Sequence, residues 1–372
     1  MKILYISHLH PPEDHPLESI GGMQNVSMQM LDVLKKKEGI EVEEIILRTS
    51  WSNIGLKTFM FLVSLLKKIP EKVDSFKPDV ILFSSMVTAG VLPFMIKKPD
   101  VPCVTINHGQ DVTLPINIYQ WYLPKVFQQL QGVISVSAAT REACIERGMD
   151  PEIGVALPNG FEPKNSADYP DKKIGRKLVE KQFGVNLEGK SLLLTVGRQV
   201  KRKGHQWFID EVMDKISSDV LFLIVGDGPE SGLIEIAREN NPKKDNIIIA
   251  GRLSDDMLQA CYAAADLFVM PNIPVEGDME GFGIVLLEAN SAGVPAVASN
   301  LEGIKDVIQQ GVNGYRVRSR SPKLFSKKID EVLQGDLEEL SESSKKYVLE
   351  HFGWDSVVNR YIQFLNKVIT KT

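Results

Sequence analysis

The stretch LLLTVGRQVKRKG (residues 192–204) opens with an apolar run and ends in a basic turn. The run LLLTV is short, continuous and rich in Leu and Val, which is typical of a strand buried on both faces of a sheet. Gly197 then allows the chain to leave the strand sharply, and Gly204 stands directly before the next helix-length segment. The order of strand, turn and helix predicts one βαβ unit of a parallel sheet.

The same order recurs along the chain in two series. Because strands that alternate with helix-length segments form parallel sheets, we expect an α/β protein with two Rossmann-like, doubly wound sheets that face a cleft. Strands are predicted in the first series at 2–7, 42–48, 79–85, 101–107, 132–137 and 153–158, and in the second at 192–197, 220–226, 246–251, 266–271 and 294–299.

A polar segment separates the two series and predicts the domain boundary. A single core rarely grows past ~250–300 residues, so two domains are expected for 372 residues. We expect an N-terminal domain at 1–165, a linker at 166–187 and a C-terminal domain at 188–353. Residues 354–372 have apolar side chains at helical spacing and predict a final helix, which Asp355 would cap.

Composition excludes several classes of protein. The net charge is −5, which argues against nucleic acid as a partner because phosphate-backbone binding needs a concentrated basic surface. The three cysteines are odd in number and lack CxxC spacing, so neither a disulfide framework nor a thiolate zinc site is expected. The first residues do not resemble a secretory signal, and no apolar run is long enough to span a bilayer. We expect a cytoplasmic protein.

Ligands of open α/β sheets bind beyond the carboxyl ends of the strands, so the residues that follow each strand are the candidates for function. Arg198 and Lys203 flank the turn after one strand and predict a phosphate site, although a solvated basic loop has the same pattern. The sequence GDGPE (226–230), which follows the next strand, has the glycine and proline residues that are typical of a turn. Arg252 and Leu253 follow a third strand, where their backbone would meet a nucleotide base.

The stretch EGFGIVLLEA (280–289) follows a fourth strand and places two carboxylates eight residues apart. A helix is expected to start near Phe282 to Ile284, where its first N–H groups and the flanking glycines make an anion site. Glu280 and Glu288 then lie on much the same side of that helix. An anion site with a carboxylate on either side matches the layout of a sugar nucleotide. Its diphosphate would lie at the helix tip, and the hydroxyl groups of its sugar and of its ribose would each meet one carboxylate. An unrelated pair of acids is the alternative.

Two further segments allow a functional and a structural interpretation. His8, His10 and His15 would lie in one early loop, and a wet loop explains them better than a metal site, so no metal is expected. In FMFLVSLL (59–66), Phe59, Leu62, Val63 and Leu66 have helical spacing and lysines lie at either end. The favoured interpretation is a helix that packs these residues into the core, with contact to an anionic membrane as the alternative.

Taken together, these motifs resemble glycosyltransferase family 4, whose retaining enzymes have the two-domain GT-B fold. The chain has the family's Glu-x7-Glu motif at 280–288 and its Arg and Lys in VGRQVKRKG. Further matching stretches are VGDGPE (225–230), AADLFVMPN (264–272), GGMQN (21–25), NHGQDV (107–112), LPNGFE (157–162) and FGWDSVVNRY (352–361). The resemblance covers nearly the whole chain and implies a hexosyltransferase, with residues 354–372 packing back on the N-terminal domain.

The resemblance also implies roles for individual residues. Glu288 would bind the ribose and Glu280 the hydroxyls of the transferred sugar, and His108 would lie beside that sugar. The diphosphate would be held by Arg198, Lys203, the backbone N–H groups near Phe282, Gly283 and Ile284, and the loop at Gly21 and Gly22. The reaction would keep the anomeric configuration and need neither metal nor other cofactor. The acceptor would be a glycan, a glycolipid or a small molecule, in polysaccharide or glycoconjugate synthesis, and peripheral contact with the inner face of the membrane stays open.

Two other functions stay open beside the transferase. One is a different GT-B enzyme of sugar nucleotides, an epimerase or a phosphorylase, although nothing marks the Schiff-base lysine that a phosphorylase would need for its pyridoxal cofactor. The other is a non-catalytic, two-lobed sugar-binding protein. Such proteins are typically exported, and paired glutamates with a cationic loop exceed what a neutral sugar requires.

Overall fold

The computed structural model describes residues 1–12, 22–49, 54–162 and 169–371. The chain divides into two compact units, which are described separately here. Unit 1 is Met1–Glu162 with Phe352–Thr372, and unit 2 is Pro163–His351. Unit 2 therefore includes the segment 166–187, for which a linker was expected; helix α7 (Lys172–Phe183) lies in that segment, with Val179 buried.

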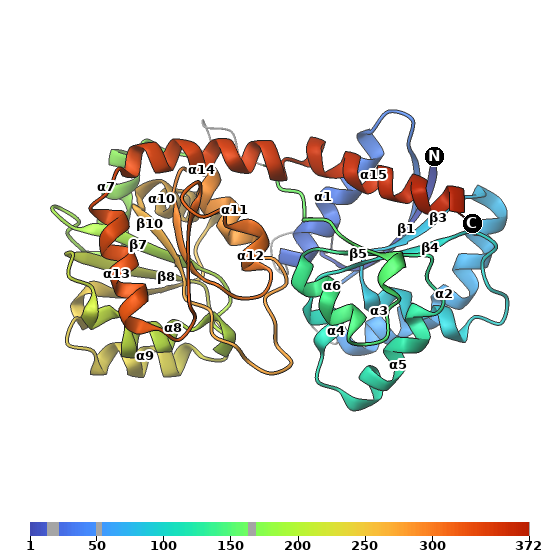
Figure 1. Ribbon diagram of the computed structural model, residues 1–372, viewed down its shortest axis with the longest axis horizontal. Helices are drawn as coiled ribbons and strands as arrows, with labels where there is room; N and C mark the ends of the chain where they lie inside the picture. Colours follow the sequence, from blue (N-terminus) through green and yellow to red (C-terminus); the bar gives the residue numbers. More distant parts are fainter. Residues whose placement is uncertain (13–21, 50–53, 163–168, 372) are drawn as a thin grey trace. The chain divides into compact units, whose positions relative to one another are not determined.

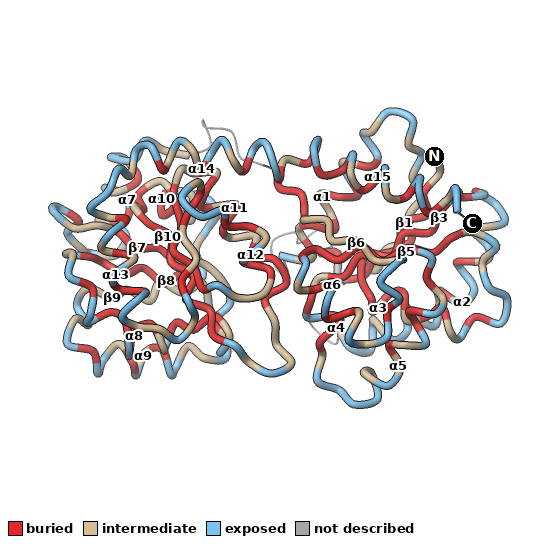
Figure 2. The backbone as a smooth tube through the Cα atoms, viewed as in Figure 1, coloured by how far each residue is buried: buried red, intermediate tan, exposed pale blue. Residues whose placement is uncertain are grey.

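Unit 1 contains a six-stranded sheet in the order β2-β1-β3-β4-β5-β6, and every pair in it is parallel. The inner strands β1, β3, β4 and β5 are almost entirely buried (Figure 2), as their apolar runs predict, whereas the edge strands β2 and β6 are mostly half-buried. All six predicted strands of the first series are confirmed. They are β1 (Lys2–His10), β2 (Glu41–Arg48), β3 (Val80–Phe83), β4 (Cys103–Asn107), β5 (Gly132–Ser135) and β6 (Gly154–Ala156).

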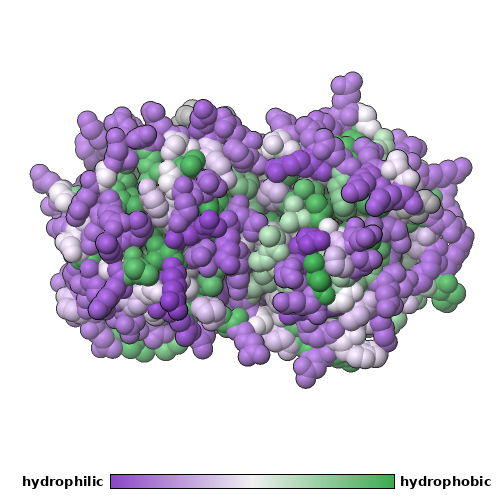
Figure 3. Space-filling view, viewed as in Figure 1, coloured by the Kyte–Doolittle hydropathy of each residue, from purple (hydrophilic) through white to green (hydrophobic). Residues whose placement is uncertain are grey.

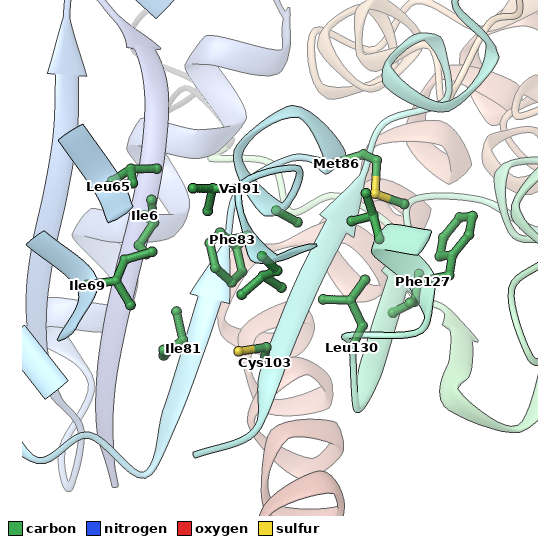
Figure 4. Close-up of a cluster of buried hydrophobic side chains, with 14 of the residues drawn as sticks. Ile6, Leu65, Ile69, Ile81, Phe83, Met86, Val91, Cys103, Phe127 and Leu130 are labelled. Carbon is green, nitrogen blue, oxygen red and sulfur yellow. The ribbon is translucent and has the colours of Figure 1, made fainter. Parts of the chain in front are cut away.

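Helices cover both faces of this sheet (Figure 1). On one face, side chains of β1, β3 and β4 pack with those of α2 and α5 in a single apolar cluster, part of which Figure 4 shows. The helical segments of unit 1 are α1 (Gly22–Lys36), α2 (Ile54–Phe76), α3 (Met86–Ala89), η1 (Leu92–Phe94), α4 (Gln110–Thr113), α5 (Asn117–Phe127), α6 (Ala138–Ile145), η2 (Pro151–Ile153) and α15 (Trp354–Lys371).

The C-terminal helix α15 packs beside α1 on unit 1 (Figure 1). The Trp354 indole N–H donates to Gln29 Oε1 at 2.8 Å, and Tyr361 is almost wholly buried. A Cβ on Gly132 of β5 would lie 3.0 Å from both Phe364 and Val368, so the helix and the sheet are in close contact. The helix begins at Trp354, and Asp355 therefore lies in its first turn rather than at the cap.

The prediction of which side of α2 packs into the core is wrong. The residues that enter the core are Phe61, Leu65 and Ile69, whereas Phe59 and Val63 are 63% and 51% exposed. The segment is apolar on nearly all sides, so its sequence does not determine which side faces the sheet. Among the described residues, no helix has the length and apolar content needed to cross a membrane.

Unit 2 repeats the architecture with the strand order β12-β11-β10-β7-β8-β9, again parallel throughout. The five predicted strands of the second series are confirmed, and the sixth, β12, was not predicted. Helices α8 (His205–Glu211), α9 (Ser231–Asn240) and α13 (Pro322–Leu333) pack on one face of the sheet around Phe208, Ile234 and Phe325. The strands are β7 (Ser191–Val196), β8 (Val220–Val225), β9 (Ile247–Gly251), β10 (Leu267–Met270), β11 (Ala296–Ser299) and β12 (Gly314–Val317).

The face of the molecule drawn in Figure 3 is mostly hydrophilic, with smaller groups of hydrophobic side chains among the hydrophilic ones. The remaining helical segments belong to unit 2, except that α14 ends on the first residue of the C-terminal part of unit 1. They are η4 (Lys201–Lys203), α8 (His205–Glu211), η5 (Met213–Lys215), α9 (Ser231–Asn240), η6 (Lys244–Asn246), α10 (Asp255–Ala264), α11 (Ile284–Ser291), α12 (Ile304–Val307), α13 (Pro322–Leu333) and α14 (Leu337–Phe352).

Candidate active site

The loops after β7 and β8 of unit 2 are packed tightly against one another at the carboxyl edge of the sheet. A Cβ on Gly226 would lie only 2.1 Å from the Gly197 carbonyl oxygen, so both loops need glycine where they meet. The Gln199 side-chain amide donates to the Gly226 carbonyl at 2.7 Å, and its backbone N–H donates to the Asp227 carbonyl at 2.7 Å. These contacts fix the backbone from which Arg198 and Lys203 project.

Lys203 and Glu280 form a buried ion pair. The Lys203 Nζ lies 2.7 Å from Glu280 Oε2, and both side chains are about nine-tenths buried. The same carboxylate oxygen accepts a hydrogen bond from Asn272 Nδ2 at 3.0 Å and lies 3.5 Å from Arg202 Nε. A second acid, Asp278, pairs with Arg202 at 3.2 Å. Two cations and two carboxylates therefore meet beside the loop that follows β10.

The charges around Glu280 determine its ionisation. Burial alone would raise the pKa of this carboxyl, but the nearby Lys203 and Arg202, with hydrogen bonds from Lys203 and Asn272, lower it to about 2. Glu280 is therefore a carboxylate at neutral pH. An ammonium group has three N–H donors, so the pair with Glu280 leaves Lys203 with donor capacity for a further anion.

The backbone of the segment from Glu280 to Ile284 lies very close to the loop that contains Gly303, and glycine residues make this close approach possible. Gly283 has φ +84° and is the residue before α11, and a Cβ on Gly303 would lie 2.0 Å from the Gly281 carbonyl oxygen. The Glu280 backbone N–H donates to the Glu302 carboxylate, which links the two loops. Helix α11 begins at Ile284, as the sequence predicts, and its first N–H groups have no intrahelical acceptor.

Glu288 lies one helical turn beyond the start of α11 and is half-buried. Its Oε2 accepts a hydrogen bond from the Tyr262 hydroxyl of α10 at 2.8 Å. Burial and the adjacent carboxylate raise the pKa of Tyr262 well above its usual value, so this hydroxyl keeps its proton and acts as a donor. The bond orients the Glu288 carboxylate on α11.

The other predicted donor-binding residues of unit 2 differ in their exposure. Arg198 is exposed, which fits a guanidinium that reaches its anion only when one is bound. Arg252 pairs with Asp227 at 2.8 Å, with both side chains mostly in solvent. Leu253 is half-buried, and Phe282 is almost completely buried.

In unit 1, His108 follows β4 and is fixed at two points. Its backbone N–H donates to Asp111 Oδ1 at 2.8 Å, and its Nε2 lies 3.0 Å from the Ser84 carbonyl oxygen. A carbonyl only accepts, so Nε2 carries the ring proton and Nδ1 is left as an acceptor. Burial lowers the pKa of His108, which is therefore neutral. Gly22 is the first residue of α1, and Gly21 lies outside the described residues.

Two of the three early histidines, His8 and His10, belong to a strand and not to a loop. His8 and His10 are both buried in β1, while His15 lies outside the described residues. His10 Nε2 lies 3.0 Å from Ser27 Oγ, which also bonds with the hydroxyls of Tyr5 and Ser7 at 2.8 Å. Ser27 thus joins α1 to β1 through a buried polar network. Within the described part of the chain, no group of three or more His, Cys, Asp or Glu residues has a geometry that could hold a metal ion.

Acidification is expected to destabilise the protein through these histidines. Burial lowers the pKa of His8 to about 4, and burial together with the nearby Arg48 lowers the pKa of His10 to about 4. Below pH ~6.5 these histidines become protonated in the unfolded chain but stay neutral in the folded protein. The free energy of unfolding therefore falls as pH decreases from ~6.5 towards ~4. Urea unfolding at pH 7 and pH 5 should show a loss of about 2 kcal/mol per histidine. In His10→Gln this loss should be smaller, and an unchanged pH dependence would contradict the assignment.

Several residues of this site were not identified from the sequence. Arg202 and Asn272 both contact Glu280, and Glu302 accepts from its backbone. Asn272 comes two residues after β10, and that position after a strand was a usable signal. The contacts of Tyr262 and Glu302 join segments far apart in the sequence, and no local pattern marks them.

Family models match both halves of the chain. Residues 21–165 match the model described as Glycosyltransferase Family 4, and residues 190–335 match the model described as Glycosyl transferases group 1. Among solved structures, the fold is similar to that of Anabaena HepE in complex with UDP, with a TM-score of 0.72 and 17% identity over 99% of this chain and 100% of that one. At this identity the likeness concerns the fold alone.

Curated relatives include an uncharacterized glycosyltransferase of Methanocaldococcus jannaschii, 28% identical over 62% of this chain. A phosphatidyl-myo-inositol mannosyltransferase of Mycobacterium leprae is 26% identical over 74% of this chain. The matches span 58% and 70% of those two proteins' own lengths. With one family model in each half of the chain and a parallel six-stranded sheet in each unit, the protein belongs to the family 4-like glycosyltransferases of the GT-B fold.

Proposed function

We propose that the protein transfers a sugar from a nucleoside-diphosphate sugar to an acceptor hydroxyl, with retention of the anomeric configuration and without a metal ion. The observation that carries this proposal is the buried pair of Lys203 with Glu280 on the loop that leads into α11, with Glu288 within that helix. A cation and a helix N-terminus suit a diphosphate, and fixed carboxylates suit the hydroxyl groups at its two ends.

In the proposed complex, each donor group has its own partners in unit 2. Glu288, oriented by Tyr262, accepts the ribose hydroxyls, and Glu280 accepts hydroxyls of the transferred sugar. The backbone N–H groups near Phe282, Gly283 and Ile284 bind diphosphate oxygens. Arg252 and Leu253 lie beside the base. In unit 1, His108 contacts the sugar, and Gly21 and Gly22 let the backbone approach the phosphate.

Charge stabilisation of the departing diphosphate is the proposed source of catalysis. Negative charge builds up on the diphosphate as the bond to the sugar breaks. Lys203 is held in place by Glu280 before the donor arrives, so little reorganisation is needed at the moment of reaction. Arg198 adds a planar guanidinium that can bind two oxygens. A departing diphosphate oxygen takes the acceptor proton, so the proposal requires no separate general base.

The acceptor is proposed to be a glycan, a glycolipid or a small molecule, in polysaccharide or glycoconjugate synthesis. We place the protein in the cytoplasm, with peripheral membrane contact.

The test is a thermal-shift screen with UDP-, GDP- and ADP-sugars, followed by transfer assays with the stabilising donor. A donor at 100 times its Kd should stabilise by about 2.7 kcal/mol. Absence of stabilisation by all three classes of donor would contradict the proposal.

Activity is expected to survive removal of divalent metal. Because two cationic side chains and a helix tip face the leaving diphosphate, EDTA should leave the transfer rate unchanged. The measurement is the initial rate after dialysis against EDTA, with and without added Mg²⁺ or Mn²⁺. Loss of activity that either ion restores would show that the leaving group needs a metal.

A further inference from the structure

Unit 1 carries an unusual concentration of exposed apolar side chains on three segments. In α2, Leu56, Phe59 and Met60 are 64%, 63% and 63% exposed, and Val63 follows at the next turn. Residues of the second and third segments are exposed to a similar or greater degree. They are Phe94 and Ile96 after α3, and Ile116, Ile118 and Trp121 around the start of α5.

These three segments lie over the same face of the sheet in unit 1. Their inward-facing neighbours Phe61, Met95 and Leu123 belong to one apolar cluster, which includes side chains of β1, β3, β4 and β5 (Figure 4). Phe94 stacks on Tyr122 with ring centroids 5.4 Å apart, so the second segment contacts α5 directly. We call the outward side of these segments the α2–α5 face.

The α2–α5 face lies partly at the carboxyl edge of the sheet. A helix that follows a strand of a parallel sheet starts at that edge and runs back across the sheet. The exposed apolar residues of α2 lie in its first half, and Ile118 and Trp121 lie in the first half of α5. His108 follows β4 at the same edge of the sheet.

Positive charge predominates on these segments, although the last part of α2 also carries Asp74 and Glu71, which lies 3.6 Å from Lys67. The stretches 54–70, 91–99 and 112–131 contain six lysines and neither Asp nor Glu, in a chain whose net charge is −5. All six lysines are exposed, and Lys125 lies 3.6 Å over the ring of Trp121. The lysines are Lys57, Lys67, Lys68, Lys97, Lys98 and Lys125.

We propose that the α2–α5 face docks the protein on the surface of an anionic lipid bilayer. Exposed Leu, Phe, Met and Trp side chains would enter the boundary between headgroups and acyl chains, and the lysines would meet anionic headgroups. A Trp with a Lys beside it is suited to this boundary because one part of each side chain is apolar and another polar. The inference does not depend on the proposed transfer reaction.

A second copy of the chain is a poorer occupant of this face. A two-fold interface brings the same patch of both copies together, which would place the lysines of one copy against those of the other. Like charges brought together in this way oppose association. The lysines favour an anionic partner, and a bilayer also accepts the apolar side chains between them.

The test uses the full chain and vesicles of phosphatidylcholine, alone or with an equal part of phosphatidylglycerol. Sedimentation should show binding to the anionic vesicles that falls as salt is added. Lys67→Glu with Lys68→Glu should weaken binding roughly tenfold or more. Phe59→Ser with Met60→Ser should weaken it at low salt and abolish it at high salt. The matched control is Leu233→Ser with Ile236→Ser in α9 of unit 2, where both residues are also exposed.

Each result decides for or against the proposal. Circular dichroism and thermal unfolding confirm that the variants are folded, which is expected because the replaced side chains are exposed. Equal binding to both kinds of vesicle, or an equal loss in the α9 control, would overturn the assignment of the face. A dimer in light scattering that Phe59→Ser with Met60→Ser converts to a monomer would instead identify the face as a contact between copies.

Discussion

Replacing Lys203 by Ala is expected to lower turnover by about 10²–10³-fold, with a smaller loss of donor affinity. The ammonium pairs with Glu280 on the loop that leads into α11 and would face the charge that develops on the diphosphate in the proposed reaction. Loss of such a group removes stabilisation present mainly in the transition state, so the maximal rate should fall more than binding. Steady-state rates and calorimetric donor affinities measure the two effects separately.

The ion pair with Glu280 requires a second variant. Without Lys203, the buried Glu280 carboxylate keeps only Asn272 and the more distant Arg202 as partners, so Lys203→Ala also disturbs that acid. Combining Lys203→Ala with Glu280→Gln gives a double-mutant cycle that separates the lost cation from the unpaired carboxylate. Lys201→Ala is the matched control, because Lys201 belongs to the same turn and is exposed. Wild-type turnover in Lys203→Ala would remove the leaving-group role.

Replacing Glu288 by Ala is expected to weaken nucleoside-diphosphate binding by about 10–100-fold. A carboxylate that accepts from two ribose hydroxyls makes two charge-assisted bonds, each worth about 1.5–3 kcal/mol, part of which water recovers when they are lost. Calorimetry with the nucleoside diphosphate measures the change without requiring an acceptor. Rates at saturating donor should change less than affinity.

Tyr262→Phe tests how Glu288 is oriented. The variant removes the hydroxyl that donates to Glu288 Oε2 and leaves the ring in place. Binding should weaken by less than in Glu288→Ala, because the carboxylate remains but is held less firmly. If Glu288→Ala binds the nucleotide as well as wild type does, the ribose assignment is wrong.

Features with strong local signals were predicted well from the sequence. The eleven predicted strands are present because continuous apolar runs bounded by glycine and proline have few alternatives in a parallel sheet. The start of α11 at Ile284 falls within the predicted range, Phe282 to Ile284, because the pattern turns from a loop to an apolar helical segment there. Strand β12 was missed because its four residues, GYRV, include Gly and Arg and do not form an apolar run.

Features that depend on tertiary contacts were not predicted. The buried side of α2 was assigned wrongly because seven of the eight residues in FMFLVSLL are apolar, so periodicity could not distinguish the sides. The Lys203–Glu280 pair joins residues 77 positions apart, and no local rule predicts that a lysine in a basic turn should pair with a buried carboxylate in this way. Both Lys203 and Glu280 were chosen for their place after a strand, which indicated a site but not its internal contacts.

The separation of unit 1 into 1–162 and 352–372 has a consequence for how the protein is made. A ribosome delivers the chain from its N-terminus, so all six strands of the first sheet emerge well before α15 is synthesised. Until then, the surface that Tyr361, Phe364 and Val368 later cover stays open to water, while unit 2 already has its whole sequence. The earliest-made half is therefore the last to be completed, and the nascent protein needs protection from aggregation there.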